Sequence, residues 1–145
     1  MGAICWNKNN AIPHPGMFQQ SFELILYATN GRDKTTKHGG MGVIDCPAPL
    51  SAQRIHPTQK PTGVYSRLYK IIGGRRVLEL FSGSASGGVA AIENGLDYIG
   101  VESSPYFVAA SRKRLRETMS KTAFLEGKKE TNPPASACQL DLFGG

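Results

Sequence analysis

The chain has 145 residues, of which 40% are hydrophobic and 19% are charged, and its formal net charge is +6. This composition is typical of a globular domain and excludes a wholly disordered chain. The sequence contains no apolar run of about 18 residues and no secretion signal, so we expect a cytoplasmic protein without membrane contact. The positive charge favours an anionic partner, and nucleic acid before a membrane.

The cysteines and histidines do not form a metal-binding pattern. Cys5, Cys46 and Cys138 are widely spaced, no Cys-x-x-Cys pair occurs, and the three histidines are scattered. We therefore expect a reduced compartment, no disulfide framework and no metal site.

The first third of the chain predicts strands joined by loops. Apolar runs predict strands within Met1–Lys8 and at Phe22–Tyr27. Residues 9–20 contain prolines and a glycine and read as a loop. Residues 41–55 are ambiguous, with a short strand at Gly42–Asp45 as one interpretation. The segment Asn30–Arg54 is either a contributor to target recognition or a solvated basic loop.

The second half predicts a strand–helix–strand unit and thus an α/β fold. The expected elements are a helix from Pro61 to Gly73-Gly74, a strand Arg76–Leu80, a loop Ser82–Gly88, a helix Val89–Glu93, a strand Tyr98–Val101 and a long helix capped by Ser103 or Ser104. Residues 1–125 form the predicted domain, and residues 126–145 form a polar, proline-containing tail.

The loop Ser82–Gly88 and the carboxylate of Glu102 together predict a nucleotide-type site. Small residues between a buried strand and a helix allow a ligand to approach the backbone closely. A carboxylate at the end of the next strand can accept hydrogen bonds from both hydroxyls of a ribose. The alternatives are an ordinary tight turn for the loop and a solvated strand end for Glu102.

Five short segments, in a fixed order along the chain, resemble the DNA amino-methyltransferases, which methylate adenine N6 or cytosine N4. The segment Arg76–Ala91 (RVLELFSGSASGGVAA) resembles the first cofactor motif of that family. Tyr98–Glu102, followed by Pro105-Tyr106 and Arg114-Leu115, resembles the second. His56–Pro61 (HPTQKP) is similar to the His-Pro-x-Gln-Lys-Pro motif, and Trp6-Asn7-Lys8 and Phe22-Glu23 resemble the later core strands.

The resemblance implies a Rossmann-like S-adenosylmethionine-dependent methyltransferase fold, in the permuted order that places the catalytic motif before the cofactor motif. It implies S-adenosylmethionine as cofactor and double-stranded DNA as substrate. The residues it assigns to the cofactor are Glu79, Phe81, Gly83, Ser84, Glu102, His56, Thr58 and Lys60. Two departures bear on cofactor affinity: Ala85 stands where the family has a glycine, and Ser86-Gly87 replaces a usual pair of threonines.

The catalytic loop of the family, Asp/Asn/Ser-Pro-Pro-aromatic, has no good counterpart. The single Pro-Pro pair lies in Asn132–Ala135, where Ala135 offers no ring and no apolar strand precedes the prolines. We therefore expect a C-terminal part that begins after that loop, with no catalytic residue, an incomplete sheet with two open edges, and no methyl transfer by the chain alone.

Three interpretations of such a chain stay open. It is part of a methyltransferase, completed by an N-terminal half or a second copy; or it is a non-catalytic remnant that binds cofactor or DNA; or it is a different nucleotide-binding protein. A different nucleotide-binding protein would leave the family-like motif at His56–Pro61 without an explanation.

The tail ends in an apolar pentapeptide that resembles the bacterial sliding-clamp ligand. A tethered Gln-Leu-Asp-Leu-Phe segment offers a glutamine for polar contacts and a Leu-Phe pair for an apolar pocket. The residues expected to bind a clamp are Gln139, Leu140, Leu142 and Phe143. The alternative is a tail that docks on its own domain.

Overall fold

The N-terminal part of the computed structural model is a three-stranded sheet. The structure describes residues 1–10, 15–16, 18, 20–30 and 42–127. Strand β1 (Gly2–Asn7) is the middle strand; it pairs antiparallel with β2 (Phe22–Tyr27) and parallel with β3 (Val43–Asp45). The two predicted apolar strands are confirmed, and the ambiguous residues 41–55 do contain a short strand.

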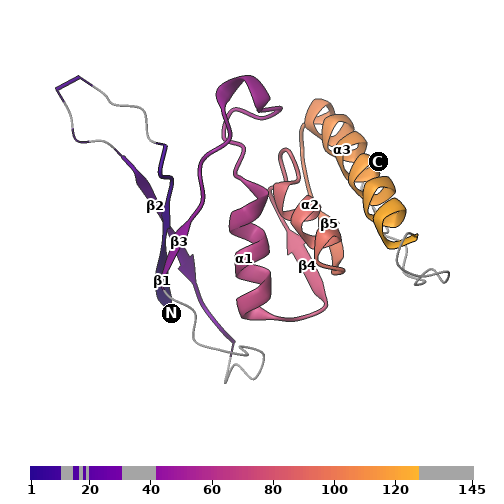
Figure 1. Ribbon diagram of the computed structural model, residues 1–145, viewed down its shortest axis with the longest axis horizontal. Helices are drawn as coiled ribbons and strands as arrows, with labels where there is room; N and C mark the ends of the chain where they lie inside the picture. The colour runs from indigo at the N-terminus through magenta and orange to yellow at the C-terminus, as the bar shows by residue number, and fades with distance from the viewer. Residues whose placement is uncertain (11–14, 17, 19, 31–41, 128–145) are drawn as a thin grey trace.

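Helix α1 (Thr62–Ile72) stands between this sheet and the rest of the molecule (Figure 1). A single 3-10 turn, η1 (Ser51–Gln53), precedes it. The helix begins after Pro61, whose fixed φ suits a helix start, and it ends at Gly73, where φ is +74°. Both predicted limits of this helix are confirmed.

The C-terminal half is the predicted strand–helix–strand unit followed by a long helix. Strand β4 (Arg76–Glu79) pairs in parallel with β5 (Asp97–Gly100), and α2 (Ser86–Glu93) connects them. Helix α3 (Pro105–Gly127) follows. Some predicted limits were wrong: α2 begins three residues earlier than Val89, β4 ends at Glu79 instead of Leu80, and β5 lies one residue earlier than predicted.

Two separate apolar clusters stabilise these halves. Trp6, Ile44 and Val64 join the first sheet to α1. The second cluster packs α2 and α3 on one face of the β4–β5 pair and contains Ala85, Val89, Ala91, Tyr98 and Leu115. Gly88 permits this packing, because a Cβ there would lie 2.6 Å from the Tyr98 ring and 2.9 Å from Leu115.

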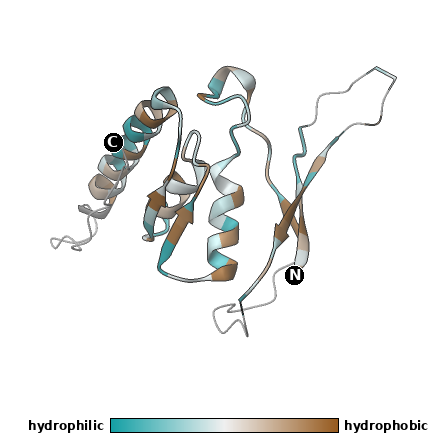
Figure 2. Cartoon of the chain, turned by 180° about the vertical axis from the view of Figure 1, so that it is seen from behind, coloured by the Kyte–Doolittle hydropathy of each residue, from teal (hydrophilic) through white to brown (hydrophobic). Residues whose placement is uncertain are grey.

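The two sheets are not joined to each other. Among the described residues, β3 pairs only with β1, and β4 pairs only with β5, so each sheet has an edge that faces the other across α1. The expectation of an incomplete sheet with two open edges is confirmed for this part of the chain. Figure 2 shows that the strands on both sides of the gap are largely hydrophobic.

No helix in the described ranges is long and apolar enough to cross a membrane. The basic segment 31–41, the Pro-Pro pair at residues 133–134 and the clamp-like residues 139–143 lie outside the described part of the chain.

Candidate functional site

A pocket of about 290 Å³ lies where β4 and β5 end, beneath the segment that precedes α1. All eight residues that the sequence assigned to a cofactor line this one pocket: His56, Thr58, Lys60, Glu79, Phe81, Gly83, Ser84 and Glu102. They come from three segments of the chain that are separated by up to 46 positions (102 − 56). The fold therefore brings the three sequence motifs together, while the role of each residue stays a prediction.

Two residues of the glycine-serine loop, one on each side of Ser84, have a positive φ. Gly83 has φ of +49°, and Ala85 has φ of +53° and ψ of +42° just before α2 begins. The Ala85 amide donates a hydrogen bond to the Ser82 carbonyl (2.6 Å), which closes the turn. Glycine adopts this conformation at no steric cost, whereas alanine does not.

Glu102 is tied to the loop by its carboxylate. One oxygen accepts a hydrogen bond from the Gly83 amide (2.8 Å), and the other accepts one from the Ser104 amide (2.9 Å). The Ser104 amide, more than the Gly83 and Ser103 amides, lowers the pKa of Glu102 below its ordinary value, although partial burial opposes this. The side chain is thus ionised and oriented, and two amides use only part of its capacity as an acceptor.

His56 is fixed over the loop by its neighbours. The Thr58 amide and hydroxyl both lie within hydrogen-bonding distance of His56 Nδ1 (3.2 and 3.1 Å). The ring also packs against Phe107 of α3, with 4.3 Å between ring centroids. An acceptor role for Nδ1 assigns the proton of the neutral ring to Nε2. His56 therefore links the HPTQKP segment to α3 across the mouth of the pocket.

Glu79 lies deeper, among tyrosine hydroxyls. Tyr98 donates a hydrogen bond to it (2.6 Å), and Tyr65 of α1 donates another. Burial raises the pKa of Glu79 above its ordinary value, and these two hydrogen bonds reduce the rise without cancelling it. The same burial, together with the charge of Glu79, raises the pKa of Tyr65 to about 12. The pocket thus holds two partly buried carboxyl groups, of which Glu79 has a raised pKa and Glu102 a lowered one.

Arg114 of α3 supports the loop from behind. One guanidinium nitrogen donates to the Ser84 carbonyl (2.9 Å) and to the Ser86 hydroxyl (3.1 Å). Burial lowers the pKa of Arg114, and no carboxylate in the described part of the chain forms an ion pair with it. The Ser84 carbonyl and the Ser86 hydroxyl are therefore the main polar partners of the Arg114 side chain.

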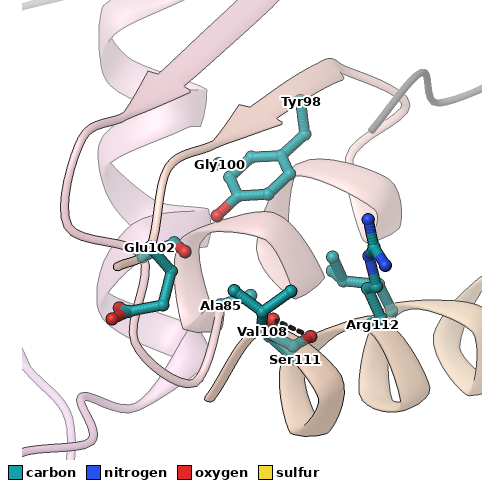
Figure 3. Close-up of a pocket in the computed structure, with 9 residues that line it drawn as sticks. Ala85, Tyr98, Gly100, Glu102, Val108, Ser111 and Arg112 are labelled. Atoms are coloured by element: carbon teal, nitrogen blue, oxygen red, sulfur yellow. Dashed lines mark hydrogen bonds between the residues drawn. The ribbon is translucent and has the colours of Figure 1, made fainter. Parts of the chain in front are cut away.

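A second, much smaller pocket lies behind Glu102, between β5 and α3 (Figure 3). It holds about 10 Å³, and Figure 3 shows Glu102 and Arg112 on opposite sides of Ala85, Val108 and Ser111. This volume suits one water molecule and excludes a nucleoside. In the described ranges no group of three or more His, Cys, Asp or Glu side chains is arranged to hold a metal ion.

Sequence reasoning missed four residues of the larger pocket: Gln59, Tyr65, Ser82 and Ser86. Gln59, Ser82 and Ser86 lie inside segments already singled out, so the motifs themselves carried a signal for them. Tyr65 and the supporting Arg114 face the site from helices. The Arg114-Leu115 pair resembles the family's second motif, but nothing in the sequence indicated that the side chains of Tyr65 and Arg114 face the site.

Several DNA methyltransferases are similar to the chain in sequence, although no protein-family model matches it. The chain is 30% identical over 141 residues to the Type II methyltransferase M.HinfI of Haemophilus influenzae, covering 79% of this chain and 38% of that protein. It is 38% identical over 66 residues to the Type II methyltransferase M2.MboI of Moraxella bovis, covering 43% of this chain and 23% of that protein.

Solved structures agree with these similarities. A complex of M1.HpyAVI with SAM superposes with a TM-score of 0.65 at 26% identity, covering 79% of this chain and 61% of that one. The cytosine-N4-specific PvuII DNA methyltransferase has a TM-score of 0.59 at 14% identity, covering 86% of this chain and 57% of that one, and shares the fold. The chain spans less than two thirds of each of these proteins.

Proposed function

We propose that this chain, which is related in sequence and fold to the DNA amino-methyltransferases, carries the S-adenosylmethionine site of such an enzyme. The predicted fold, a Rossmann-like one shared with S-adenosylmethionine-dependent methyltransferases, is confirmed by the solved structures. Because the chain spans only part of its relatives, methyl transfer to DNA is an activity of a larger assembly in this proposal.

The bond between the Gly83 amide and Glu102 is the observation that carries the proposal. It joins the glycine-serine loop to the carboxylate that follows the next strand, and both line one pocket. The free acceptor capacity of Glu102 suits the two hydroxyls of a ribose, which donate both their protons. Glu102 is partly exposed and lines the pocket, so its carboxylate is accessible to such a ligand.

The other groups of the pocket fit the remainder of S-adenosylmethionine. The cofactor supplies a methyl group on a sulfonium cation, next to an amino-acid end that carries an ammonium and a carboxylate. Glu79 offers a negative charge to the cationic centres, and Lys60 offers a positive charge to the carboxylate. A volume of about 290 Å³ lies at the small end of the usual range for small-molecule sites.

The acceptor in this proposal is an exocyclic amine of DNA, adenine N6 or cytosine N4. The net charge of +6 favours a phosphate backbone. Activating that amine requires the base to leave the stack and an oxygen to accept a hydrogen bond from the amine. No residue of the described pocket is assigned to this step, which we assign to a complementing segment with a Pro-Pro-aromatic loop.

The bare face of the β4–β5 pair supports a complementing segment. Leu78 and Ile99 lie opposite each other in the register, and their exposed fractions are 62% and 45%. Parallel strands normally have both faces covered and no free central edge. A segment that adds strands between β3 and β4 would pair the open edges, and a helix of that segment would cover these side chains. An N-terminal half or a second copy of the chain could supply such a segment.

Glu102→Gln tests the cofactor assignment. It keeps the shape of the side chain and removes its charge, so the ribose and the two amides lose a charged acceptor. We expect the dissociation constant for S-adenosylhomocysteine to rise by the equivalent of about 1–3 kcal/mol. Isothermal titration calorimetry on the 145-residue chain measures this change.

Glu117→Gln is the matched control, because Glu117 is an exposed carboxylate on α3 that does not line the pocket. It should leave the affinity unchanged. Equal affinities for wild type and Glu102→Gln would refute the assignment, provided that circular dichroism shows both proteins folded.

A sliding clamp is a further proposed partner. It rests on Gln139, Leu140, Leu142 and Phe143 as a sequence pattern, and these residues lie outside the described part of the chain. A clamp that slides along DNA would raise the local concentration of target sites for the tethered enzyme.

A further inference from the structure

Lys60 of the HPTQKP segment contacts a group of three residues from β1, β2 and the position just after β1. Together they form a compact cluster of three charged side chains around one tryptophan. Glu23 lies between two ammonium groups, at 3.0 Å from Lys8 Nζ and in direct hydrogen-bonding contact with Lys60 Nζ. Both ammonium groups also lie near the Trp6 ring, at 5.6 and 5.3 Å from its centroid. We call Trp6, Lys8, Glu23 and Lys60 the lysine bridge.

Three of these residues meet because of strand geometry. Trp6 and Glu23 are directly opposite each other in the antiparallel β1–β2 pair, so their side chains share one face of the sheet. Lys8 follows Trp6 by two positions and continues on the same side. The Trp6 indole donates to the Cys46 carbonyl (2.6 Å) and is 3% exposed, so the ring is a fixed platform.

The fourth residue comes from a different part of the fold. Lys60 belongs to the HPTQKP segment and lines the cofactor pocket, whereas Glu23 does not. Burial would raise the pKa of Glu23, but the hydrogen bonds from Lys60 and Lys8 outweigh burial and hold the pKa below its ordinary value. The carboxylate is thus ionised at neutral pH and can bind both ammonium groups.

The lysine bridge fixes a side chain that would otherwise be mobile. Lysine carries its charge on a flexible four-carbon stem, and Lys60 is 38% exposed at its side chain. Among the described residues, Lys60 is the one lysine that lines the pocket. Its contacts with Glu23 and Trp6 lie toward β1 and β2, while Glu102 borders the same pocket on the side of α3.

We propose that Glu23 is a positioning residue for cofactor binding, which holds the Lys60 ammonium against the end of the pocket remote from Glu102. The proposal rests on the proposed function. With the ribose at Glu102, the amino-acid end of the cofactor lies toward Lys60, and its carboxylate is the partner of the positioned ammonium. Glu23 acts on that end alone and does not touch the ligand.

Two ligands separate this role from a merely structural one. S-adenosylhomocysteine has the amino-acid end, and 5′-methylthioadenosine lacks it while keeping the adenosine. In Glu23→Gln, affinity for S-adenosylhomocysteine should fall about three- to tenfold, as for loss of a partly buried ion pair. Affinity for 5′-methylthioadenosine should stay at the wild-type value. Calorimetry on the full 145-residue chain measures both.

A double-mutant cycle tests whether Glu23 acts through Lys60. Lys60→Met should show the same selective loss, and Glu23→Gln should add no further loss in the Lys60→Met background. Lys8→Met leaves the Glu23–Lys60 pair intact and should not change the ratio of the two affinities. Asp97→Asn, which breaks the exposed pair with Arg76 (3.2 Å) away from the pocket, is a second control.

The outcomes are distinct. Equal weakening of both ligands by Glu23→Gln, or additive losses in the cycle, would overturn the positioning role and leave the cofactor assignment standing. A wild-type chain that binds neither ligand would overturn the proposed function, and this proposal with it.

Discussion

Ala85 occupies a backbone conformation that usually requires glycine. Its φ of +53° and ψ of +42° place it in the left-handed region, directly before α2, and its side chain is 1% exposed. The left-handed conformation costs an L-residue about 1–2 kcal/mol. This conformation explains why the related methyltransferases are expected to have glycine here. Alanine fits the position at a cost in folding free energy.

Ala85→Gly should relieve that cost. The relief of about 1–2 kcal/mol exceeds the roughly 0.8 kcal/mol lost with one buried methyl group. We expect the free energy of unfolding to stay level or rise by up to about 1 kcal/mol, with no loss of affinity for S-adenosylhomocysteine. Urea denaturation followed by circular dichroism measures the stability.

Ala90→Gly is the contrasting variant, because Ala90 is fully buried in the middle of α2, where its backbone is helical. It should lose about 1–2 kcal/mol from helix propensity and the buried methyl together. Equal destabilisation by both substitutions would show that Ala85 is not strained.

At the scale of elements, α3 acts as a support for the cofactor loop. Its Ser111 and Leu115 are buried against the rest of the domain, and its Arg114 reaches the Ser84 carbonyl and the Ser86 hydroxyl. The helix thus connects the hydrophobic cluster to the position of the loop. A hydrogen bond from a charged guanidinium to a carbonyl oxygen is stronger than a hydrogen bond between two neutral groups.

Arg114→Met should therefore weaken both folding and ligand binding. Loss of charged hydrogen bonds predicts a decrease of about 1–3 kcal/mol in the free energy of unfolding. The dissociation constant for S-adenosylhomocysteine should rise, and Arg114→Lys should give a smaller loss, since one ammonium reaches fewer of these acceptors. Calorimetry and urea denaturation measure the two effects.

Arg116→Met is the control on the same helix, because Arg116 is exposed. It should change neither quantity. If Arg114→Met bound ligand as well as wild type, the support of the loop by α3 would be excluded.

At the scale of the whole molecule, the proposed function gives the described chain one side of a reaction site. The candidate cofactor pocket is formed, and the two sheets end in edges that face each other across α1. Exposed apolar side chains on β4 and β5 border this gap, among them Leu78 and Ile99. A surface of this kind is typical of an interface.

The purified 145-residue chain should consequently transfer no methyl group to DNA. The groups that hold and activate the target amine are, in our proposal, on a complementing segment. Adding a segment with an Asp/Asn/Ser-Pro-Pro-aromatic loop should produce activity, measured as incorporation of labelled methyl groups into duplex DNA. The same segment with alanine in place of the aromatic residue is the control and should remain inactive.

Incorporation by the chain alone would contradict this expectation. It would direct attention to Asn132–Ala135, the Pro-Pro segment outside the described residues.

The residues of the candidate site could be predicted from sequence because they belong to short, contiguous motifs. Residues 79–84 run from the end of one strand into a loop, Glu102 follows the next strand, and residues 56–60 form an unbroken pattern. The family resemblance of these motifs grouped them into one site. The start of α2 at Ser86 was harder to predict. Serine and glycine are poor helix formers, and burial in the packed domain overrides their propensity.

The sequence by itself determined the fold class, most strands and helices, and the eight residues around the pocket. Strand alternation puts Trp6 and Lys8 on one face of their strand, but the register that sets Glu23 beside them was decided by the structure. Only the tertiary structure decided that Lys60 completes that cluster, that Tyr65 faces Glu79, and that Arg114 supports the loop. These contacts join residues far apart in the chain through side-chain packing, for which periodicity and spacing carry no signal.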